Sequence, residues 1–599
     1  MGPGGYRPRN LLVPASELRM AARKAGRRVG AAHLRLGALG VGLALAWLGM
    51  AVRLYHVQVI QAPDLAEQGV EQRQIDRDLV AQRGNIFDRN GDLLAMTVEA
   101  ASLFVNPQEL TEPVFVAQQM GGLLGRDPDA LLEQFSSDRQ FVYLKRQVDP
   151  EVAEEILAFD LPGVYSHPEP KRVYPTGTVS SHVVGFVNVD GVGAEGIEFE
   201  FDDLLKGEPG QVVFEQAPNG VPIPWAPSRS VPAVPGADLI TTIDGPIQYS
   251  AEDACRETLV VTGGASCWIV VMEVETGEIL AIAGAPAFDP AIRRGTDGTP
   301  FSNFAVRGMY EPGSTQKLIT FAAALEEGVV KPDTLIRGVD DIIELRPQAC
   351  TRADDEIFGC YEDFDTHETQ DMTASDVFRR SSNVGTIMVA QLMPPDLLGR
   401  YLDAFAFGHP TGLDYPGEAS GLINLDPSCE VCPLSAAIGY GVAVTSVQMA
   451  SAYAAIGNDG VWVQPHIVIS AHGLGGDTQV FAPESHRVVS RETAATMRLL
   501  LSEVVEAGTG ISAQIPGYQV GGKTGTANKL GDDGRYTEIT MASFVGMAPI
   551  DDPKVVVAVV VDSPAFEFQT GGLAAAPAFA KVMEQALHRL GVTPDVSSG

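Results

Sequence analysis

One uncharged apolar run limits how this chain folds. It extends for 17 residues, from Leu36 to Val52, is bounded by Arg35 and Arg53, and continues into a second short apolar pair. This length is at the short end for a helix that crosses a bilayer. The Arg53 side chain can reach back to the membrane surface. The run therefore predicts a transmembrane anchor at residues 36–55.

The segment before this run is strongly basic. Residues 1–35 carry a net charge of +7, whereas the whole chain carries −34. Basic flanks stay on the cytoplasmic side, so we predict a cytoplasmic tail at 1–35, a single pass through the cell inner (cytoplasmic) membrane and an extracytoplasmic, periplasmic remainder. The alternative is a cleaved signal peptide, but its basic region would be unusually long and no small-x-small cleavage site precedes Tyr55. The apolar run Val555–Val561 is too short to span and predicts a buried strand.

The length and the charge of the chain limit the number of domains and the kinds of partner that it can have. A chain of 599 residues is too long for one ordinary domain, so two or more cores are expected. Its acidity argues against nucleic acid as a partner, because no basic face is available to neutralise phosphates. The proline-rich stretch Pro218–Pro235 predicts a boundary between an N-terminal region at 56–235 and a second domain at 236–592, followed by a polar tail at 593–599.

All six cysteines follow the predicted anchor, and an even number in an oxidising compartment favours disulfides. Proximity in the sequence favours Cys350 with Cys360 and Cys429 with Cys432, which leaves Cys255 with Cys267. A metal site is the rival for Cys429 and Cys432, but no second Cys or His pair at zinc-like spacing accompanies them.

The stretch Glu311–Lys317 carries the first chemical signal. Pro312 and Gly313 are turn residues, and apolar residues at helical spacing follow up to Gly328, so Ser314 is predicted at a helix start with Lys317 one turn on. A serine is a weak nucleophile until its proton is removed. A lysine on the same face removes it if burial or a cationic neighbour lowers its pKa. The plain alternative is a serine cap followed by a surface lysine.

The pattern beyond residue 236 predicts a mixed α/β domain. The expected strands are Leu239–Asp244, Val520–Asn528, Thr540–Pro549 and Val555–Asp562, and Cys267–Val274 is expected to form a hairpin with Glu278–Ala283. The expected helices are Ile247–Leu259, Met372–Met393, Ser446–Ile456 and Pro577–Leu590. The segment Pro347–Asp371 is expected to be a loop.

Two further stretches support the functional interpretation of Ser314. Ser381 and Asn383 form a Ser-x-Asn triplet within an expected helix, and Lys523-Thr524-Gly525-Thr526 lies in a region rich in strands. Ser-x-x-Lys, a Ser-x-Asn type triplet and Lys-Thr-Gly occur in this order in penicillin-binding proteins and serine β-lactamases. The chain resembles a class B penicillin-binding protein, a peptidoglycan D,D-transpeptidase.

This resemblance implies a fold and a set of roles. The fold is an α/β (α+β) transpeptidase domain, with a five-stranded antiparallel sheet flanked by helices and an all-helical lobe, after a mixed α+β dimerisation or pedestal module and one transmembrane helix. Ser314 is the expected nucleophile, Lys317 its base and Ser381 a proton relay. Asn383 is expected to bind a substrate backbone amide, and Lys523, Thr524 and Thr526 are expected to bind the terminal carboxylate. Gly525 is expected to let the substrate approach the strand backbone closely. The N–H groups of Ser314 and Thr526 are expected to form the oxyanion hole.

The N-terminal region carries the remaining resemblance, at Arg83–Ala95, Arg172–Pro175 and His182–Glu198. Asn90-Gly91 predicts a hairpin. The acidic positions around it weakly suggest a calcium loop, but the distal glutamate is missing, so a structural role is favoured. His182 is a candidate base without a partnered serine, and a structural role is again favoured.

The resemblance also indicates partners. These are stem peptides ending in D-Ala-D-Ala, β-lactams as covalent inhibitors, a membrane-embedded glycan-polymerising partner and other division proteins; it implies no cofactor and no metal. Glu311–Thr315 and Gly521–Ala527 favour the division-specific over the elongation type. The alternatives are an inactive division scaffold and a β-lactam sensor. A Gly-x-Ser-x-Gly hydrolase elbow is absent from the sequence.

Overall fold

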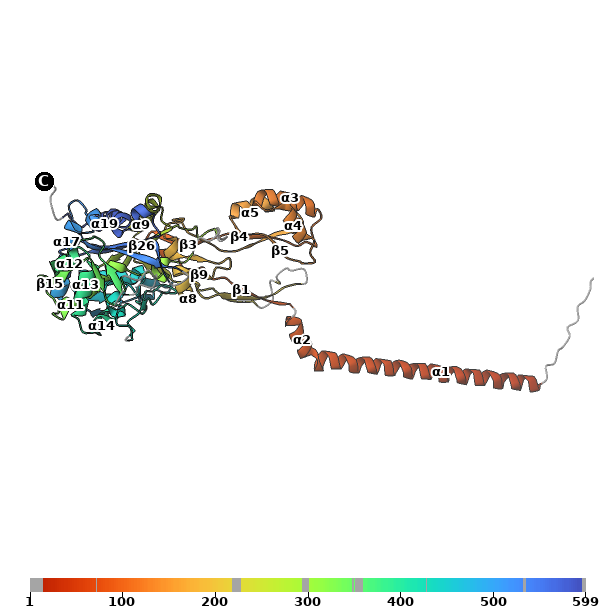
Figure 1. Ribbon diagram of the computed structural model, residues 1–599. Coiled ribbons are helices and arrows are strands. Elements are labelled where there is room, and N and C mark those ends of the chain that lie inside the picture. Colours follow the sequence, from red (N-terminus) through yellow and green to blue (C-terminus); the bar gives the residue numbers. More distant parts are fainter. Residues whose placement is uncertain are drawn as a thin grey trace, which may run out of the picture. The chain divides into compact units, whose positions relative to one another are not determined.

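The structure of the chain is a computed structural model that describes residues 15–71, 73–217, 223, 228–292, 301–346, 349–350, 359–426, 428–531 and 535–594 (Figure 1). It divides into two compact units. One comprises Met1–Leu79 and Gly210–Pro232, and the other comprises Val80–Pro209 and Ala233–Gly599.

The first unit contains the N-terminal helix and a small sheet. Helix α1 (Ala15–Tyr55) continues as a π-helical turn (His56–Ile60) and is followed by α2 (Ala62–Glu71). Within the described part of the chain, His33–Ile60 is the helix long and apolar enough to cross a membrane, and the predicted anchor lies inside it. Strand β10 (Gly210–Glu215) pairs antiparallel with β1 (Gln74–Leu79) and β11 (Arg229–Val231).

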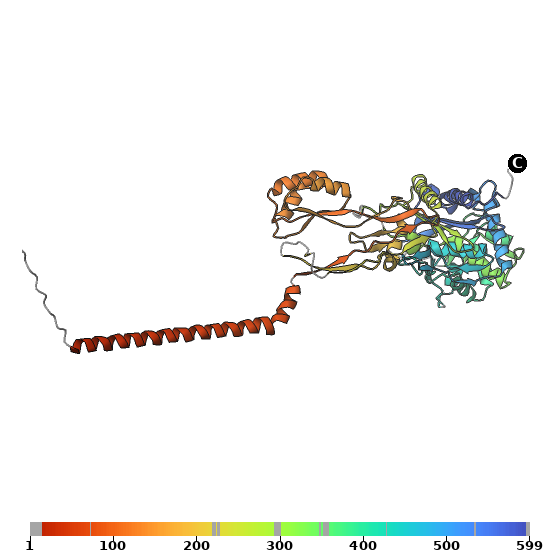
Figure 2. The ribbon, with the colours of Figure 1, turned by 180° about the vertical axis from the view of Figure 1, so that it is seen from behind.

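In the second unit, three helices pack on a three-stranded sheet (Figures 1 and 2). Strand β4 (Ala101–Val105) lies between β5 (Val142–Val148) and β6 (Val164–Pro168). The helices α3 (Pro113–Leu124), α4 (Pro128–Phe135) and α5 (Pro150–Leu157) each begin with proline, which fits the first helical turn because its missing N–H has no partner there. Leu103, Met120 and Leu131 are fully buried in this core.

A six-stranded sheet joins segments from both sides of the predicted boundary at residue 236. Its order is β23 (Thr478–Val480), β22 (Val468–His472), β12 (Asp238–Thr241), β2 (Ile86–Phe87), β3 (Leu93–Val98) and β7 (Lys171–Val173). The buried Glu198 carboxylate accepts hydrogen bonds from Arg83 at 2.7 Å and Arg172 at 2.6 Å. The two sequence regions therefore share one sheet and one core.

The acidic segment around Asn90 and the side chain of His182 both make contacts that stabilise the fold. Asn90-Gly91 forms the predicted turn between β2 and β3. Asp88 is buried, and its carboxylate accepts the N–H groups of Asn90, Asp92 and Gly245. The ring of His182, in α6 (Ser181–Val184), packs edge-on against aromatic neighbours, with ring centroids 4.9 Å from Trp268 and 5.1 Å from Phe288.

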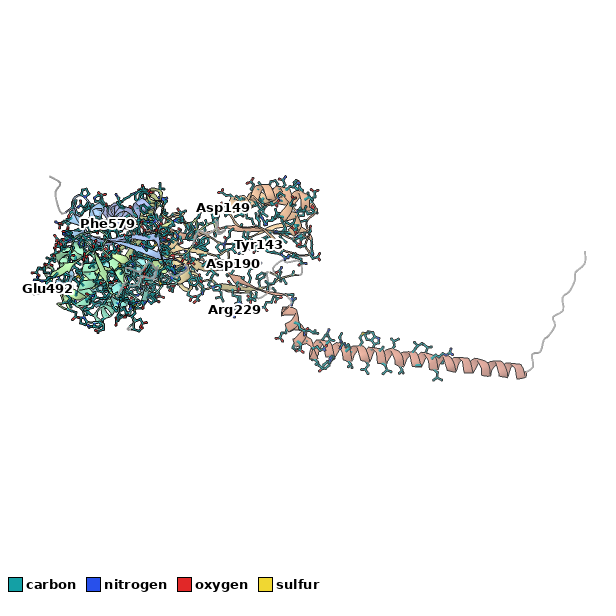
Figure 3. All side chains as sticks on the ribbon, viewed as in Figure 1. Tyr143, Asp149, Asp190, Arg229, Glu492 and Phe579 are labelled. Atoms are coloured by element: carbon teal, nitrogen blue, oxygen red, sulfur yellow. A yellow bond between two sulfur atoms is a disulfide. The ribbon has the colours of Figure 1, made fainter. Side chains whose placement is uncertain are left out.

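The central sheet of the second unit is five-stranded and antiparallel, as the resemblance implied. Its order is β14 (Ile279–Ala285), β13 (Ser266–Glu273), β27 (Val555–Asp562), β26 (Tyr536–Ala548) and β25 (Gly521–Leu530). Helices α9 (Gly245–Thr262) and α19 (Ala576–Arg589) cover one face. Phe579, which is labelled in Figure 3, lies on α19. Its ring packs on that of Phe544 in β26. Val557 and Val559 face these helices, whereas Val556 and Val560 lie in the other core. Burial on both faces explains the uninterrupted apolar run.

A helical lobe covers the other face of this sheet. It includes α11 (Lys317–Glu326), α12 (Ala374–Arg379), α13 (Asn383–Gln391), α14 (Leu397–Ala404), α15 (Cys432–Ala437), α16 (Ser446–Gly457) and α17 (Arg491–Ala507). The prediction of one helix at Met372–Met393 is wrong. Ser381 has a left-handed backbone with φ of 62° and ends α12, and Ser382 caps α13 through the Gly385 N–H.

The second unit also contains the short helices α7 (Gly196–Glu200), α8 (Asp202–Leu205), α10 (Phe304–Arg307) and α18 (Gly571–Ala574). Its other short strands include β8 (Phe186–Val187), β9 (Gly193–Glu195), β19 (Leu422–Ile423), β20 (Val442–Ala443), β21 (Val461–Val463) and β24 (Ser485–Arg487).

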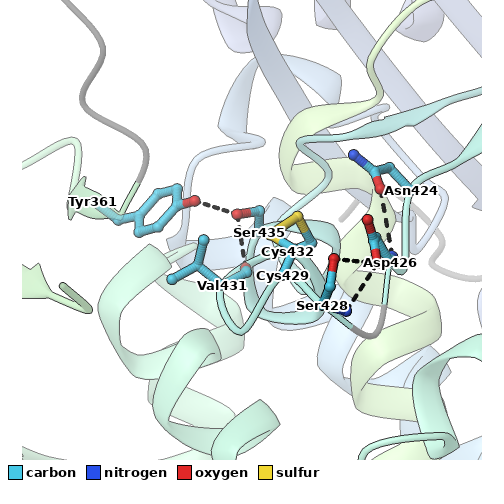
Figure 4. Close-up of a disulfide and its surroundings, with 8 residues drawn as sticks. All are labelled: Tyr361, Asn424, Asp426, Ser428, Cys429, Val431, Cys432 and Ser435. Atoms are coloured by element: carbon cyan, nitrogen blue, oxygen red, sulfur yellow. Dashed lines mark hydrogen bonds between the residues drawn. A yellow bond between two sulfur atoms is a disulfide. The ribbon is translucent and has the colours of Figure 1, made fainter.

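The cysteine-bearing insertion is more ordered than a loop. Strand β16 (Ile342–Glu344) pairs with β17 (Cys360–Glu362), and β15 (Leu335–Val339) pairs with β18 (Gln370–Thr373); residues 347–348 and 351–358 lie outside the described range. The three disulfides join Cys255 to Cys267, Cys350 to Cys360 and Cys429 to Cys432. The Tyr361 hydroxyl contacts the Ser435 hydroxyl beside the third disulfide, so the hairpin is tied to α15 (Figure 4).

Candidate active site

Ser314 lies on a tight turn that leads into α11. The turn is a 3-10 helix, Gly313–Gln316, and Lys317 begins the α-helix. Gly313 has φ of 52°, and a Cβ there would lie 2.7 Å from the Thr526 carbonyl oxygen, so only glycine allows β25 to approach this closely. In this turn Ser314 is part-exposed, whereas Lys317, the first residue of α11, is fully buried.

The Lys317 amine is held by the Ser-x-Asn triplet. Its Nζ donates to the Ser381 carbonyl oxygen and to Asn383 Oδ1, both at 2.7 Å, and lies 3.5 Å from Ser381 Oγ. Burial lowers the pKa of Lys317 to about 7, although the nearby Asp363 carboxylate opposes this shift. A neutral amine is therefore accessible near neutral pH, which is what a base for Ser314 requires.

Lys523 approaches the same hydroxyl from the strand. Its Nζ lies 2.7 Å from Ser381 Oγ. Burial, and then the positive charge of Lys317, lower the pKa of Lys523 well below its ordinary value. The amines of Lys317 and Lys523 thus converge on the Ser381 hydroxyl. The left-handed backbone of Ser381 is the local feature that turns its side chain toward both amines.

The exposed edge of β25 forms one wall of the cleft. Thr524 Oγ1 lies 2.7 Å from Thr509 Oγ1, and Thr526 Oγ1 accepts the Gly571 N–H at 3.3 Å. A Cβ at Gly525 would overlap Ser543 Oγ and would lie 2.7 Å from the Pro312 carbonyl oxygen. Gly525 is therefore required for the strand to pack against the serine turn.

These elements enclose a cleft of about 800 Å³. Among the predicted residues, Ser314, Ser381, Asn383, Thr524 and Thr526 line it, whereas Lys317 and Lys523 are buried at its base. Residues that the sequence did not single out for the site also line the cleft; they are Glu362, Asp363, Phe364, Asp365, His367, Met372, Arg379, Arg380, Ser382, Tyr440, Ala507, Gly508, Thr509, Asn528, Thr540, Gln569, Thr570, Gly572 and Leu573.

Tyr440 shows why these additional residues were missed. The sequence places Gly439-Tyr440-Gly441 only before a helix. In the structure, Gly439 touches the Gly313 backbone, and Glu311 Oε1 accepts the Gly441 N–H at 2.7 Å. The two flanking glycines were the available signal, because they mark a close approach of backbone segments, but they do not tell which segments meet.

The comparisons with known proteins agree with this fold. Residues 267–584 match the family described as the penicillin binding protein transpeptidase domain, and residues 78–241 match the penicillin-binding protein dimerisation domain. The chain belongs to the penicillin-binding proteins, and the two domains together are consistent with class B, as the sequence motifs indicated.

Particular relatives cover nearly the whole chain. Penicillin-binding protein PbpB of Mycobacterium tuberculosis is 33% identical over 91% of this chain and 84% of its own length. Peptidoglycan D,D-transpeptidase FtsI of Escherichia coli is 30% identical over 92% of this chain and 91% of its own. The crystal structure of penicillin-binding protein 3 from Mycobacterium tuberculosis, complexed with aztreonam, has a TM-score of 0.67 and 28% identity, covering 87% of this chain and 98% of that one.

Proposed function

We propose that this protein is a peptidoglycan D,D-transpeptidase that works through a serine acyl-enzyme. The observation that carries the proposal is the convergence of the Lys317 and Lys523 amines on Ser381 in the cleft that Ser314 lines. Ser314 Oγ attacks the carbonyl carbon of the penultimate D-alanine. Neutral Lys317 takes the hydroxyl proton, and the C–N bond to the terminal D-alanine breaks.

The leaving amine needs a proton, and we expect Ser381 to deliver it. Its hydroxyl lies 3.5 Å from Lys317 Nζ, so the proton taken from Ser314 returns through Ser381 to the departing nitrogen. The backbone N–H groups of Ser314 and Thr526 would stabilise the negative charge on the carbonyl oxygen. A donor of this kind typically contributes about 3 kcal/mol to the transition state.

The substrate carboxylate is expected to meet hydroxyl groups first. Thr524 and Thr526 line the cleft, whereas Lys523 is fully buried with a lowered pKa. A bound carboxylate raises the pKa of a neighbouring amine. Substrate binding would therefore favour the charged form of Lys523. The charged amine would in turn attract the substrate carboxylate more strongly.

The acyl group is expected to pass to an amine of a neighbouring stem peptide, which gives a cross-link. In class A β-lactamases a glutamate acting through a water serves deacylation, and no sequence motif here supplies such a base. A penicilloyl-Ser314 ester would therefore hydrolyse slowly, so β-lactams would act as inhibitors. The relative whose solved structure contains aztreonam supports this expectation.

Labelling with a fluorescent penicillin tests the nucleophile. The full chain in membranes should form a covalent ester on Ser314, and Ser314→Ala should abolish it while leaving thermal unfolding unchanged. An adduct mapped to another residue by mass spectrometry would refute the assignment.

Acyl transfer distinguishes this enzyme from a hydrolase or a scaffold. A thioester analogue of a D-alanyl stem should acylate the protein, and an added D-amino acid should accept the acyl group faster than water does. Rapid penicillin turnover would favour a hydrolase, and a folded protein that no substrate acylates would favour a scaffold.

The cellular role and orientation are part of the proposal. The stretches Glu311–Thr315 and Gly521–Ala527, which resemble those of the division-specific type, support a role in septal wall synthesis. The basic residues before the anchor support a cytoplasmic N-terminus. The partners would be a membrane-embedded glycan polymerase and other division proteins. Protease added outside spheroplasts should degrade most of the chain, and complete protection would contradict this topology.

A further inference from the structure

We propose that Asp363 and His367 are a positioning pair that fixes the start of α13, where Asn383 lies, and supplies a negative charge near Lys317. This inference rests on the proposed function, because it concerns two residues beside the base of that reaction. Both residues line the cleft, and both follow β17, the strand of the insertion whose role the sequence did not reveal.

The end of β17 binds the start of α13 at two consecutive positions. The Glu362 carbonyl accepts Asn383 Nδ2 at 2.8 Å, and Asp363 Oδ1 accepts the Val384 N–H at 2.9 Å. The first bond orients the Asn383 amide so that its oxygen faces the Lys317 amine, and the second caps the first turn of α13. Asp363 is itself fixed, because its N–H donates to the Asp341 carbonyl at 2.8 Å.

The Asp363 carboxylate is well shielded and has a partner on its other oxygen. Its side chain is 6% exposed, and Oδ2 lies 3.2 Å from His367 Nε2. His367 Nδ1 lies 2.9 Å from the Glu368 carbonyl oxygen. Both ring nitrogens thus face acceptors, which only the doubly protonated imidazolium can satisfy. The Glu368 carbonyl and then Asp363 raise the pKa of His367, while burial opposes this.

The charges around Lys317 give this pair an effect on the reaction. Lys523 repels a positive charge on Lys317, and Asp363 is the carboxylate that favours it; Ser381 and Asn383 contribute neutral acceptors. His367 offsets part of the Asp363 charge when protonated. The Asp341 carboxylate also favours the imidazolium. The other charged residues that line the cleft are Glu362 and Asp365, which are acidic, and Arg379 and Arg380, which are basic.

Two substitutions should therefore act in opposite directions. Asp363→Asn keeps an oxygen for the Val384 N–H but removes the charge, so the pKa of Lys317 should fall. His367→Gln removes the compensating cation, so the pKa of Lys317 should rise. Because Lys317 must be neutral to accept a proton, the acid limb of acylation should move to lower pH in the first variant and to higher pH in the second.

The test measures penicillin acylation of the full-length protein from about pH 5 to about pH 9. We expect shifts of about one to two pH units in opposite directions, as an effective dielectric near 20 gives for unit charges about 6 to 12 Å apart. Asp365→Asn is the matched control, because it removes a charge from the same cleft two residues away at an exposed position that solvent screens, whereas Asp363 is shielded. The control should leave the acid limb in place. A purely structural role would lower the rates without opposite shifts.

NMR titration of labelled His367 and Lys317 separates this proposal from the proposed function. Asp363→Asn should lower the pKa of both side chains. If Lys317 titrates at lower pH in that variant but the acid limb stays in place, the positioning pair is supported and Lys317 is not the base. If the pKa of Lys317 does not change, or if both variants shift the acid limb in the same direction, the positioning pair is refuted.

Discussion

Glu252 makes the stability of this protein depend on pH. It lies on α9, is 6% exposed, and its Oε1 accepts the Ser180 N–H at 2.7 Å and Gln248 Nε2 at 2.8 Å. Burial raises the pKa of Glu252 from 4.5 to about 7. The folded protein therefore binds a proton more tightly than the unfolded chain does, so stability is greatest below about pH 4.5 for this group and falls as pH rises toward 7.

The size of the effect follows from the pKa difference. One pKa unit corresponds to about 1.4 kcal/mol, so the charged carboxylate costs up to about 3 kcal/mol above pH 7. Glu252→Gln keeps one oxygen in the place of Oε1, and both hydrogen bonds with it, but carries no charge. We expect the variant to match the wild type at about pH 4 and to exceed its unfolding free energy by up to about 3 kcal/mol at about pH 8.

Thermal unfolding of the full-length protein at these two pH values is the assay. Glu257→Gln on the same helix is the matched control, because its side chain is 62% exposed and its ion pair with Lys581 should contribute less than about 1 kcal/mol. The reasoning would be refuted by a Glu252→Gln variant whose midpoint differs from that of the wild type equally at both pH values, or falls below it at about pH 8.

Three further predictions concern the catalytic cleft. Acylation by penicillin should fall about tenfold per pH unit below the Lys317 pKa of about 7, because the neutral amine is depleted; a pH-independent rate in stopped-flow labelling would exclude Lys317 as the base. Gly525→Ala should abolish acylation and lower the unfolding midpoint, since its Cβ would lie 2.7 Å from the Pro312 carbonyl oxygen; unchanged labelling would contradict the close packing seen here. Replacing Cys350 and Cys360 with serine should slow acylation several-fold, by loosening the hairpin that holds the second catalytic motif; equal rates in the variant and wild type would show that the disulfide is dispensable.

Short-range patterns sufficed for most of the elements around the site. The helix at Ser446–Gly457 follows from apolar periodicity, the strand at Val555–Asp562 from a short uninterrupted apolar run, and the Asn90-Gly91 turn from local backbone preference. The order of the Ser314, Ser381 and Lys523 motifs indicated the family before any contact was known. The helix, the strand and the turn depend on residues that are close in sequence. The family assignment depends on the order of three motifs that is already associated with penicillin-binding proteins.

Tertiary structure decided the features that depend on distant segments. The helix predicted across Ser381 failed because propensity alone does not reveal a left-handed residue, which here brings the Ser381 hydroxyl between two buried amines from α11 and β25. Their lowered pKa values arise from burial, which a single sequence does not report. The six-stranded sheet crosses the predicted boundary near residue 236 because β12 pairs with β2, more than 150 residues earlier.

The sequence by itself determined an acidic chain with one membrane-spanning candidate and three motifs in the order found in penicillin-binding proteins. It left the insertion at Pro347–Asp371 without a role. Only the structure showed that the described end of this insertion binds α13, through Glu362 and Asp363. The physical reason is that a side chain's charge and orientation near a site depend on which segments pack together, and packing is a property of the whole fold.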